Sequence, residues 1–122
     1  MVEQFFTSDY IAHLTDRDMQ SGHDGVRKVL GMLRRAFPKI QVEVEILVEG
    51  EARVAWQRTF QGTQEGAYLG FPASGRHLVW RDMVTSEFRG GLIAEEWVIT
   101  DLAEQLLRAR KRRPGGPASK RR

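Results

Sequence analysis

The chain has 122 residues, with 19 basic and 16 acidic side chains, a formal net charge of +3 and no cysteine. This length predicts one domain, large enough to bury a core and to line a small pocket. The absence of cysteine excludes a disulfide framework, a thiolate nucleophile and a cysteine-ligated metal. Nothing resembles a signal peptide and no apolar run approaches membrane-spanning length, so we expect a cytoplasmic protein without a membrane partner.

The positive charge is concentrated at the end of the chain. Residues 108–122 contain eight basic side chains and no acidic one, which leaves 11 basic against 16 acidic residues elsewhere, a net charge of about −5. The body therefore offers no basic surface for nucleic acid, and we expect no specific nucleic-acid partner. Residues 111–122 include Pro-Gly-Gly-Pro, which predicts a disordered basic tail after a single domain spanning residues 1–110.

The first part of the chain predicts helical structure. Residues 1–13 are apolar in two groups separated by Ser8-Asp9, which suggests a short helical piece and then a turn that ends at His13. A lone histidine in such a place is more often a hydrogen-bonded structural residue than a catalyst. Ser21 to Asp24 have capping-box spacing, and apolar residues then recur at helical spacing until Pro38. This pattern predicts an amphipathic helix over 26–37.

Four strands are predicted after this helix. Residues 41–49 alternate strictly between apolar and polar side chains, and 53–62, 76–89 and 92–101 also read as strands. A short helix follows over 102–110. Helices first and a meander of long strands afterwards indicate an α+β fold, with one curved antiparallel sheet and the 26–37 helix on its concave side.

Two of the strands place polar side chains on faces that should be inward. Arg58 interrupts an apolar face that also contains Val54, Trp56 and Phe60, and a buried arginine must find a carboxylate partner or extend to water. On the next strand, one face carries Trp80, Asp82, Val84, Ser86 and Phe88. These residues make Arg58 and Asp82 candidates for polar groups within an aromatic pocket.

The closing strand, 92–101, carries the main catalytic candidate. Strict alternation places five residues on one side: Ile93, Glu95, Trp97, Ile99 and Asp101. A carboxylate at the end of an apolar, aromatic row can have a raised pKa, and so can act as an acid or base. The residues alone favour Asp101 as the cap of the helix that begins at Leu102, and the two roles are compatible.

In order along the chain, these segments resemble the SnoaL-like polyketide cyclases and ester cyclases of the NTF2-like superfamily. The similarity covers roughly 7–107, and the residues that carry it are Gly25, Ala36-Phe37-Pro38, Val42-Glu43-Val44-Glu45, Gly62-Thr63-Gln64-Glu65-Gly66, Leu69-Gly70, Pro72, Gly75-Arg76, Gly91-Leu92-Ile93-Ala94-Glu95-Glu96-Trp97 and Asp101. The resemblance implies a cone in which a curved sheet wraps helices around a deep apolar pocket, usually within a dimer. It also implies ring closure by intramolecular aldol chemistry without a cofactor, with a pocket aspartate as acid/base.

The resemblance matches Asp101 to that aspartate, and His13 to a histidine that commonly follows the family's second helix. Two positions depart from the family: Gln64 stands where many relatives have histidine, and Val84 where they often have histidine or aspartate. Relatives also have a further helix ahead of Val2. The resemblance therefore implies either that this first helix is missing or that the true start lies upstream.

Two functions remain open on these residues. The first is a cofactor-independent cyclase or isomerase in which Asp101 abstracts a proton next to a carbonyl, while Arg58, Gln64 or a protonated Asp82 stabilises the enolate. The second is a non-catalytic binding protein in which Arg58 and Asp101 form a buried ion pair. In both, a small apolar ligand would contact four aromatic side chains: Trp56, Phe60, Trp80 and Trp97.

Two further expectations concern metals and assembly. His13, His23 and His77 lack paired ligand spacing, and no Gly-x-Ser-x-Gly motif is present, so a metal site or a hydrolase has little support. We expect a homodimer through the convex face of the sheet, where four apolar side chains would otherwise be exposed among charges: Leu47, Val79, Met83 and Val98.

Overall fold

The computed structural model describes residues 2–14, 18–20 and 22–111. The elements, in chain order, are a 3-10 turn (Val2–Gln4), β1 (Phe6–His13), β2 (Asp18–Gln20), α1 (Gly22–Ala36), β3 (Gln41–Glu49), β4 (Arg53–Thr63), β5 (His77–Arg89), β6 (Leu92–Thr100) and α2 (Leu102–Lys111). Among these residues no helix is both long and apolar enough to cross a membrane. The predicted basic tail lies outside the described residues, apart from its first residue at the end of α2.

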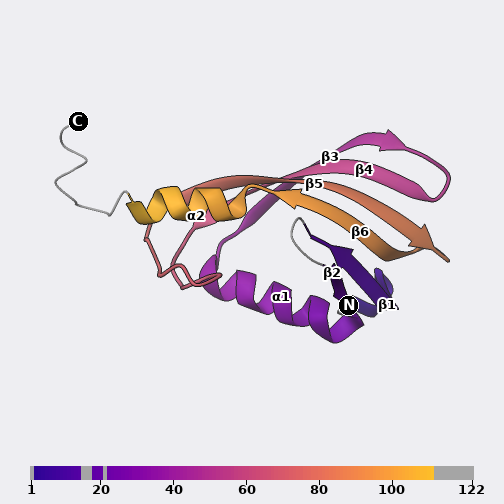
Figure 1. Ribbon diagram of the computed structural model, residues 1–122, viewed down its shortest axis with the longest axis horizontal. Coiled ribbons are helices and arrows are strands. Elements are labelled where there is room, and N and C mark those ends of the chain that lie inside the picture. The colour runs from indigo at the N-terminus through magenta and orange to yellow at the C-terminus, as the bar shows by residue number, and fades with distance from the viewer. Residues whose placement is uncertain (1, 15–17, 21, 112–122) are drawn as a thin grey trace.

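The strands form one mixed sheet in the order β2-β1-β6-β5-β4-β3 (Figure 1). Strands β3 to β6 pair with their sequence neighbours in antiparallel fashion, which confirms the predicted meander. Strand β1 lies parallel to β6, and β2 pairs with the outer side of β1. The result is the predicted α+β architecture with a curved, unclosed sheet.

The N-terminal segment differs from the prediction. Phe6–His13 is a strand rather than a helical piece and a turn. Its backbone partner is β6, with Phe6 opposite Ile93 and His13 opposite Trp97. Because this partner lies more than eighty residues away, local sequence pattern gives no sign of it.

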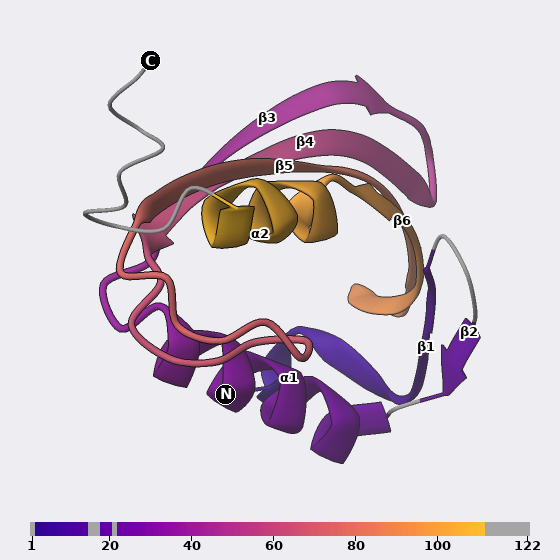
Figure 2. The ribbon, with the colours of Figure 1, turned by 60° about the vertical axis from the view of Figure 1, so that its left-hand side comes forward.

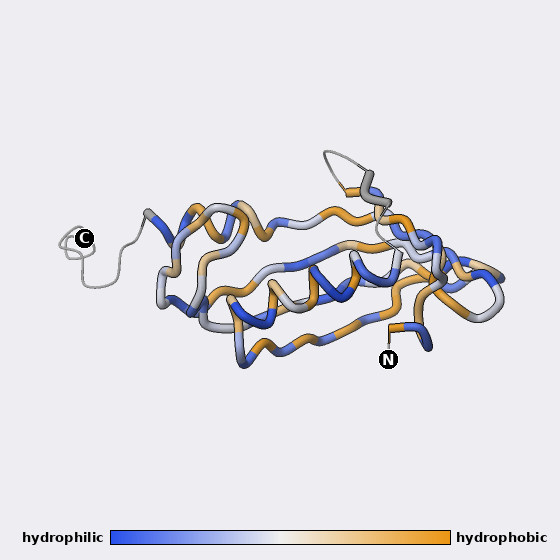
Figure 3. Tube along the Cα trace, turned by 90° about the horizontal axis from the view of Figure 1, so that it is seen from below, coloured by the Kyte–Doolittle hydropathy of each residue, from blue (hydrophilic) through white to orange (hydrophobic). Residues whose placement is uncertain are grey.

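The helices lie on the concave side of the sheet, and Figure 2 shows the sheet curving over both of them. Along α1 hydrophilic and hydrophobic residues alternate at helical spacing (Figure 3), as predicted from the sequence. Within α1, Met32, Leu33 and Ala36 pack toward β5 and α2, whereas Val26 packs toward β1. One end of α1 therefore packs against β5 and α2, and its other end packs against β1.

The concave face holds two separate apolar clusters. The α2 core is built around Phe37, Trp80 and Leu106, each at most 2% exposed. The β1 core joins four buried residues at the other end: Val2, Tyr10, Val26 and Ile93. Burial of these side chains is the main favourable term that holds the helices against the sheet. Polar residues, among them Arg58 and Glu96, lie between the two clusters.

A β-bulge at Ala94 reverses the expected faces of β6. On β5, Glu87 pairs with Glu95 and Phe88 pairs with Ile93, so Ala94 is an extra residue on β6. A bulge shifts the alternation by one residue. Beyond it, Glu96 and Val98 lie opposite Ser86 and Val84 on the concave face.

Because of the bulge, several β6 residues lie on the face opposite to the one predicted for them. Glu95, Trp97 and Ile99 lie on the convex face, opposite the face predicted for them. Val98 does not belong to the predicted convex apolar patch, because it faces Val84 on the concave side. The alternation of β4 and β5 agrees with the prediction, since Trp56, Arg58 and Phe60 lie opposite Val84, Asp82 and Trp80 in turn.

Candidate functional site

A group of polar side chains lies on the concave face between the two apolar cores. We call it the concave polar cluster; its members are Tyr10, Trp56, Arg58, Ser86 and Glu96. They come from four adjacent strands, β1, β4, β5 and β6. Paired strands place these residues side by side, since Ser86 lies directly opposite Glu96 in the ladder.

Glu96 is the centre of this cluster and is only 3% exposed. Its Oε1 accepts a hydrogen bond from the Tyr10 hydroxyl at 2.8 Å. Its Oε2 accepts one from Ser86 Oγ at 2.5 Å and one from Arg58 Nη2 at 2.9 Å. Burial, and then the negative charge of Glu96, raise the pKa of Tyr10, so its hydroxyl stays protonated and donates.

Trp56 completes a closed circuit of contacts around Arg58. Trp56 Nε1 donates to Ser86 Oγ at 2.9 Å, and the Arg58 guanidinium carbon lies 4.8 Å from the centroid of the Trp56 ring. Arg58 therefore has the carboxylate partner that its inward position demanded, and that partner is Glu96. The sequence alone suggested an ion pair between Arg58 and Asp101 instead.

Asp82 lies next to the cluster, opposite Arg58 on β4 and Thr100 on β6. Burial raises the pKa of its carboxyl, and the nearby charges of Asp101 and Glu96 raise it further, against opposing effects of Thr100 and Arg58. Asp82 Oδ1 is buried and has no hydrogen-bond partner among the described residues. A carboxyl oxygen in this state is available to a proton or to a ligand.

Asp101 lies at the junction of β6 and α2. Its Oδ1 accepts a hydrogen bond from the Arg81 backbone amide at 2.8 Å, and its Oδ2 accepts one from Gln105 Nε2 at 3.2 Å. Its backbone carbonyl accepts the first bond of the helix, from the Gln105 amide. Asp101 thus holds the N-cap position of α2 through its backbone carbonyl alone, while its two carboxylate oxygens are engaged by Arg81 and by the Gln105 side chain.

Gln64 is fully buried and holds together the loop between β4 and β5. Its amide nitrogen lies within hydrogen-bond distance of the carbonyls of Gly66, Phe71 and Pro72, and its oxygen accepts from Ser74 Oγ. The structure therefore uses this side chain for loop packing. The same loop brings Tyr68 into the α2 core, where burial and then the charge of Asp82 raise its pKa.

The predicted aromatic wall is divided between the two faces. Phe60 and Trp80 stack on the concave face with centroids 5.3 Å apart, and Trp56 lies on the same face. Trp97 lies on the convex face, where its ring stacks on His13 at 5.0 Å. His13 Nε2 lies 2.6 Å from Glu95 Oε2, so this pair is separated from the concave polar cluster by the thickness of the sheet.

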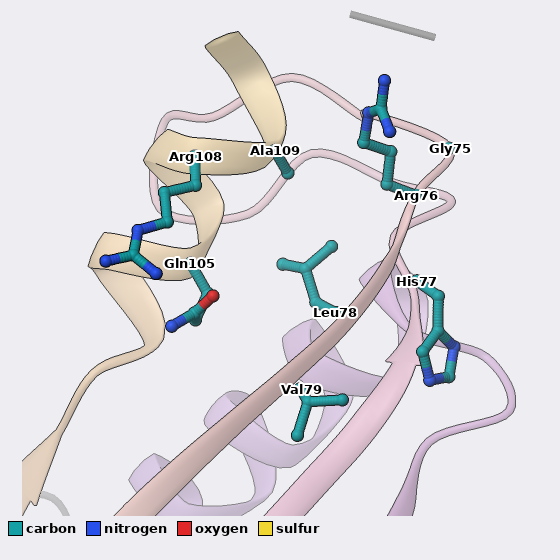
Figure 4. Close-up of a pocket in the computed structure, with 8 residues that line it drawn as sticks. All are labelled: Gly75, Arg76, His77, Leu78, Val79, Gln105, Arg108 and Ala109. Atoms are coloured by element: carbon teal, nitrogen blue, oxygen red, sulfur yellow. The ribbon is translucent and has the colours of Figure 1, made fainter. Parts of the chain in front are cut away.

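A cleft of about 580 Å³ lies at the opposite end of the molecule, between α2 and the start of β5. Its lining includes Arg76, His77, Gln105 and Arg108 but no carboxylate. Figure 4 shows the side chains of Arg76 and Arg108 pointing away from each other rather than toward a common point. Within the described residues, no three His, Asp or Glu side chains gather where they could hold a metal ion.

Sequence reasoning missed three members of the cluster: Tyr10, Ser86 and Glu96. Ser86 was assigned to the correct face, but a serine there gives no chemical signal by itself. Glu96 was placed on the wrong face because strict alternation ignores a bulge. The usable signal was Arg58, since a buried arginine requires a carboxylate partner, and in the structure that partner is Glu96.

The profile of the family described as SnoaL-like polyketide cyclase matches residues 1–108, so the chain belongs to this family. No curated protein shows significant sequence similarity to it.

Several solved structures share the fold. A SnoaL-like protein from Jannaschia sp. CCS1 is 25% identical, with a TM-score of 0.79 over 93% of this chain and 78% of that one. TsrD from Streptomyces laurentii is 25% identical, with a TM-score of 0.73 over 86% and 79%. A SnoaL-like polyketide cyclase from Agrobacterium tumefaciens is 23% identical, with a TM-score of 0.71 over 88% and 80%.

Proposed function

We propose that this protein is a cofactor-independent cyclase or isomerase of the SnoaL-like type, acting on a small, largely apolar carbonyl compound. The observation that carries the proposal is Asp82, a concave-face carboxyl with a raised pKa and a buried oxygen that has no partner among the described residues. A carboxyl whose pKa is raised is a stronger base when ionised, and it holds a proton over a wider pH range than an ordinary carboxyl does.

The proposed chemistry uses two side chains from neighbouring strands. Ionised Asp82 removes a proton from the carbon next to a substrate carbonyl, and the electron pair moves to the carbonyl oxygen as an enolate. Arg58, opposite Asp82 in the ladder, donates to that oxygen. In a cyclase the enolate carbon then attacks a second carbonyl of the same molecule, and the new alkoxide takes the proton from Asp82.

The aromatic side chains beside these groups support an apolar substrate. Phe60 and Trp80 stack next to Asp82 along the same face, and Trp56 flanks Arg58. Trp80 is only 2% exposed within the α2 core, so a flat ligand would stack on the half-buried rings of Trp56 and Phe60, which suit an unsaturated or aromatic compound. These residues and the family membership support the proposed substrate class.

Asp101 is the other candidate for the acid/base role, since it matches the family aspartate. Its two oxygens are engaged by Arg81 and Gln105, whereas Asp82 Oδ1 has no hydrogen-bond partner within the described part of the chain. We therefore assign the proton transfer to Asp82 and give Asp101 a supporting role, in which its negative charge helps to raise the pKa of Asp82.

Exchange of substrate protons with solvent tests this assignment without knowledge of the natural product. The wild-type protein is incubated in D2O with a panel of 1,3-diketones and β-keto esters, and deuterium uptake is followed by mass spectrometry. Asp82→Asn should slow the catalysed exchange by about 10²–10⁴-fold, the usual loss for a proton-transfer group. Asp101→Asn should slow it much less. The reverse order would assign the role to Asp101.

A non-catalytic binding protein is the second candidate, and the Arg58–Glu96 ion pair favours it. Buried pairs of this kind occur in proteins with no reactive function. If ligands from the same panel bind to the protein, as shown by tryptophan fluorescence, but no variant or wild-type protein accelerates exchange, the binding function is correct and the catalytic proposal fails.

A further inference from the structure

The contacts around Arg58 fix its head group while leaving part of it accessible. Glu96 engages Nη2, and the Trp56 ring lies against the guanidinium plane. Among the described residues no hydrogen bond uses Nε or Nη1, and the side chain remains 22% exposed. Arginine presents its donors as a rigid planar fork, so fixing one nitrogen and the plane also fixes the direction of the other donors.

Glu96 is in turn held from three directions. Tyr10 donates to one oxygen, Ser86 and Arg58 donate to the other, and Ser86 also accepts from Trp56. The contacts therefore form a closed ring, Glu96–Ser86–Trp56–Arg58, which restricts the side-chain conformation of each residue in it. Such a network costs side-chain entropy and desolvation, so fold stability alone is a poor reason for it.

We infer that Glu96 is a positioning residue, which together with Tyr10 and Ser86 presets Arg58 as the binding point for an enolate-type anionic oxygen of the ligand. This inference rests on the proposed function, and it adds the residues that orient the oxygen-binding group. Tyr10 acts at the far side of Glu96, so its effect on the ligand passes entirely through Glu96 and Arg58.

Charge balance explains why the preferred ligand is an oxygen that acquires charge. Glu96 already balances the charge of Arg58, so a permanently anionic ligand gains less than it would from an isolated arginine. A neutral carbonyl oxygen binds weakly to the fixed donors, and the same oxygen binds more tightly once it becomes an enolate. Interactions that strengthen only as charge develops are the ones that accelerate a reaction.

The test uses 4-nitrophenol as a probe of the oxygen site. Its ionised form is a delocalised, enolate-like oxyanion, and its visible absorbance reports ionisation directly. 4-Nitroanisole, which has the same ring but cannot ionise, serves as the neutral control. Binding is measured by titration with the wild-type protein and with three variants: Tyr10→Phe, Arg58→Met and the double variant.

For the wild-type protein we expect 4-nitrophenol to ionise at a lower pH when bound than when free, and Arg58→Met to abolish this shift. Tyr10→Phe removes one hydrogen bond to Glu96 and should weaken binding of the phenolate about three- to tenfold, a typical loss for one buried hydrogen bond. In the Arg58→Met background the same Tyr10→Phe change should have no effect on the phenolate. Binding of 4-nitroanisole should be unchanged by Tyr10→Phe.

A purely structural role gives a different pattern. Tyr10→Phe would then lower stability without changing phenolate binding, or would weaken binding equally in both backgrounds, and either result would overturn the inference. Failure of the wild-type protein to bind the phenolate, or binding without the ionisation shift, would also overturn it. The outcome is separable from the proposed function, because the probe undergoes no turnover and the exchange assay depends on Asp82.

Discussion

Two adjacent residues, Glu95 and Glu96, occupy opposite faces of the same sheet and have different surroundings. Glu95 lies on the convex face beside His13, and its side chain is 34% exposed. Glu96 lies on the concave face with Tyr10, Ser86 and Arg58, and its side chain is 4% exposed. The comparison shows that one bulge residue, Ala94, decides which carboxylate enters the site.

The energetic consequences of the two positions also differ. An ion pair near the surface is screened by water and contributes little to stability. A buried pair contributes little net stability over an apolar replacement, but removing one partner leaves an uncompensated charge and several unsatisfied groups. The concave carboxylate is therefore sensitive to substitution, and the convex one is tolerant.

The largest predicted difference is between Glu96→Ala and Glu95→Ala. Glu96→Ala leaves Arg58, Tyr10 and Ser86 without their acceptor and should lower the free energy of unfolding by about 3–5 kcal/mol. Glu95→Ala removes only the contact with His13 and should lower it by about 0–1 kcal/mol. Urea unfolding followed by tryptophan fluorescence measures both. Equal losses would contradict the assignment of the two faces.

Deleting Ala94 tests the bulge itself. Without this residue Ile93, Glu95 and Glu96 alternate regularly, so Glu96 keeps its concave position and the expected loss of stability is about 1–2 kcal/mol. Deleting Val98 is the matched control, because it moves Ile99 and Thr100 to the wrong faces and should cost considerably more. A larger loss from the Ala94 deletion, measured by the same unfolding experiment, would show that the bulge is not where the pairing places it.

The convex face carries the exposed apolar residues on which the predicted homodimer depends. Val79 and Met83 are 42% and 44% exposed there. We expect self-association at roughly tens of micromolar, the range of a weak dimer, and Met83→Glu should weaken it about tenfold by placing a charge in the interface. Sedimentation velocity measures this. A wild-type protein that stays monomeric throughout this concentration range would contradict the predicted homodimer.

The smallest predicted effect concerns stability and pH. Because the pKa of Asp82 is raised from 3.8, the folded protein holds this proton more tightly than the unfolded chain does. Asp82 therefore contributes most stability below pH 3.8, and that contribution is lost as pH rises through the raised folded pKa. Asp82→Asn should remove this part of the pH dependence in urea unfolding. A contribution that instead grows with pH in this window would contradict the raised pKa.

Much of the fold could be predicted from the sequence because the pattern is local. Strict alternation located β3 at residues 41–49 as observed, and apolar spacing located the main helix. Strand β1 was missed because its structure depends on pairing with β6, far along the chain. The faces of the candidate residues were predicted in part: Arg58, Asp82 and Trp56 share the concave face, whereas Trp97 and His13 lie on the convex face.

The residues that could not be predicted share a physical cause. A bulge has no sequence signature in this strand, so the face of Glu96 could not be read from alternation. Asp101 was favoured because it closes an apolar row and matches the family aspartate, but its hydrogen bonds to Arg81 and Gln105 depend on how β5 and α2 meet. Contacts of this kind arise from tertiary packing and not from residue spacing.

The most direct test of the account is the titration of Asp82 in the folded protein. Carbon-13 NMR of the aspartate carboxyl groups, assigned with Asp82→Asn and Asp101→Asn, gives the pKa of Asp82 without any substrate. We expect a pKa clearly above 3.8 for Asp82, and a lower one in the Asp101→Asn variant because a neighbouring negative charge is removed. A pKa at or below 3.8 would contradict the assignment of Asp82 as the acid/base group.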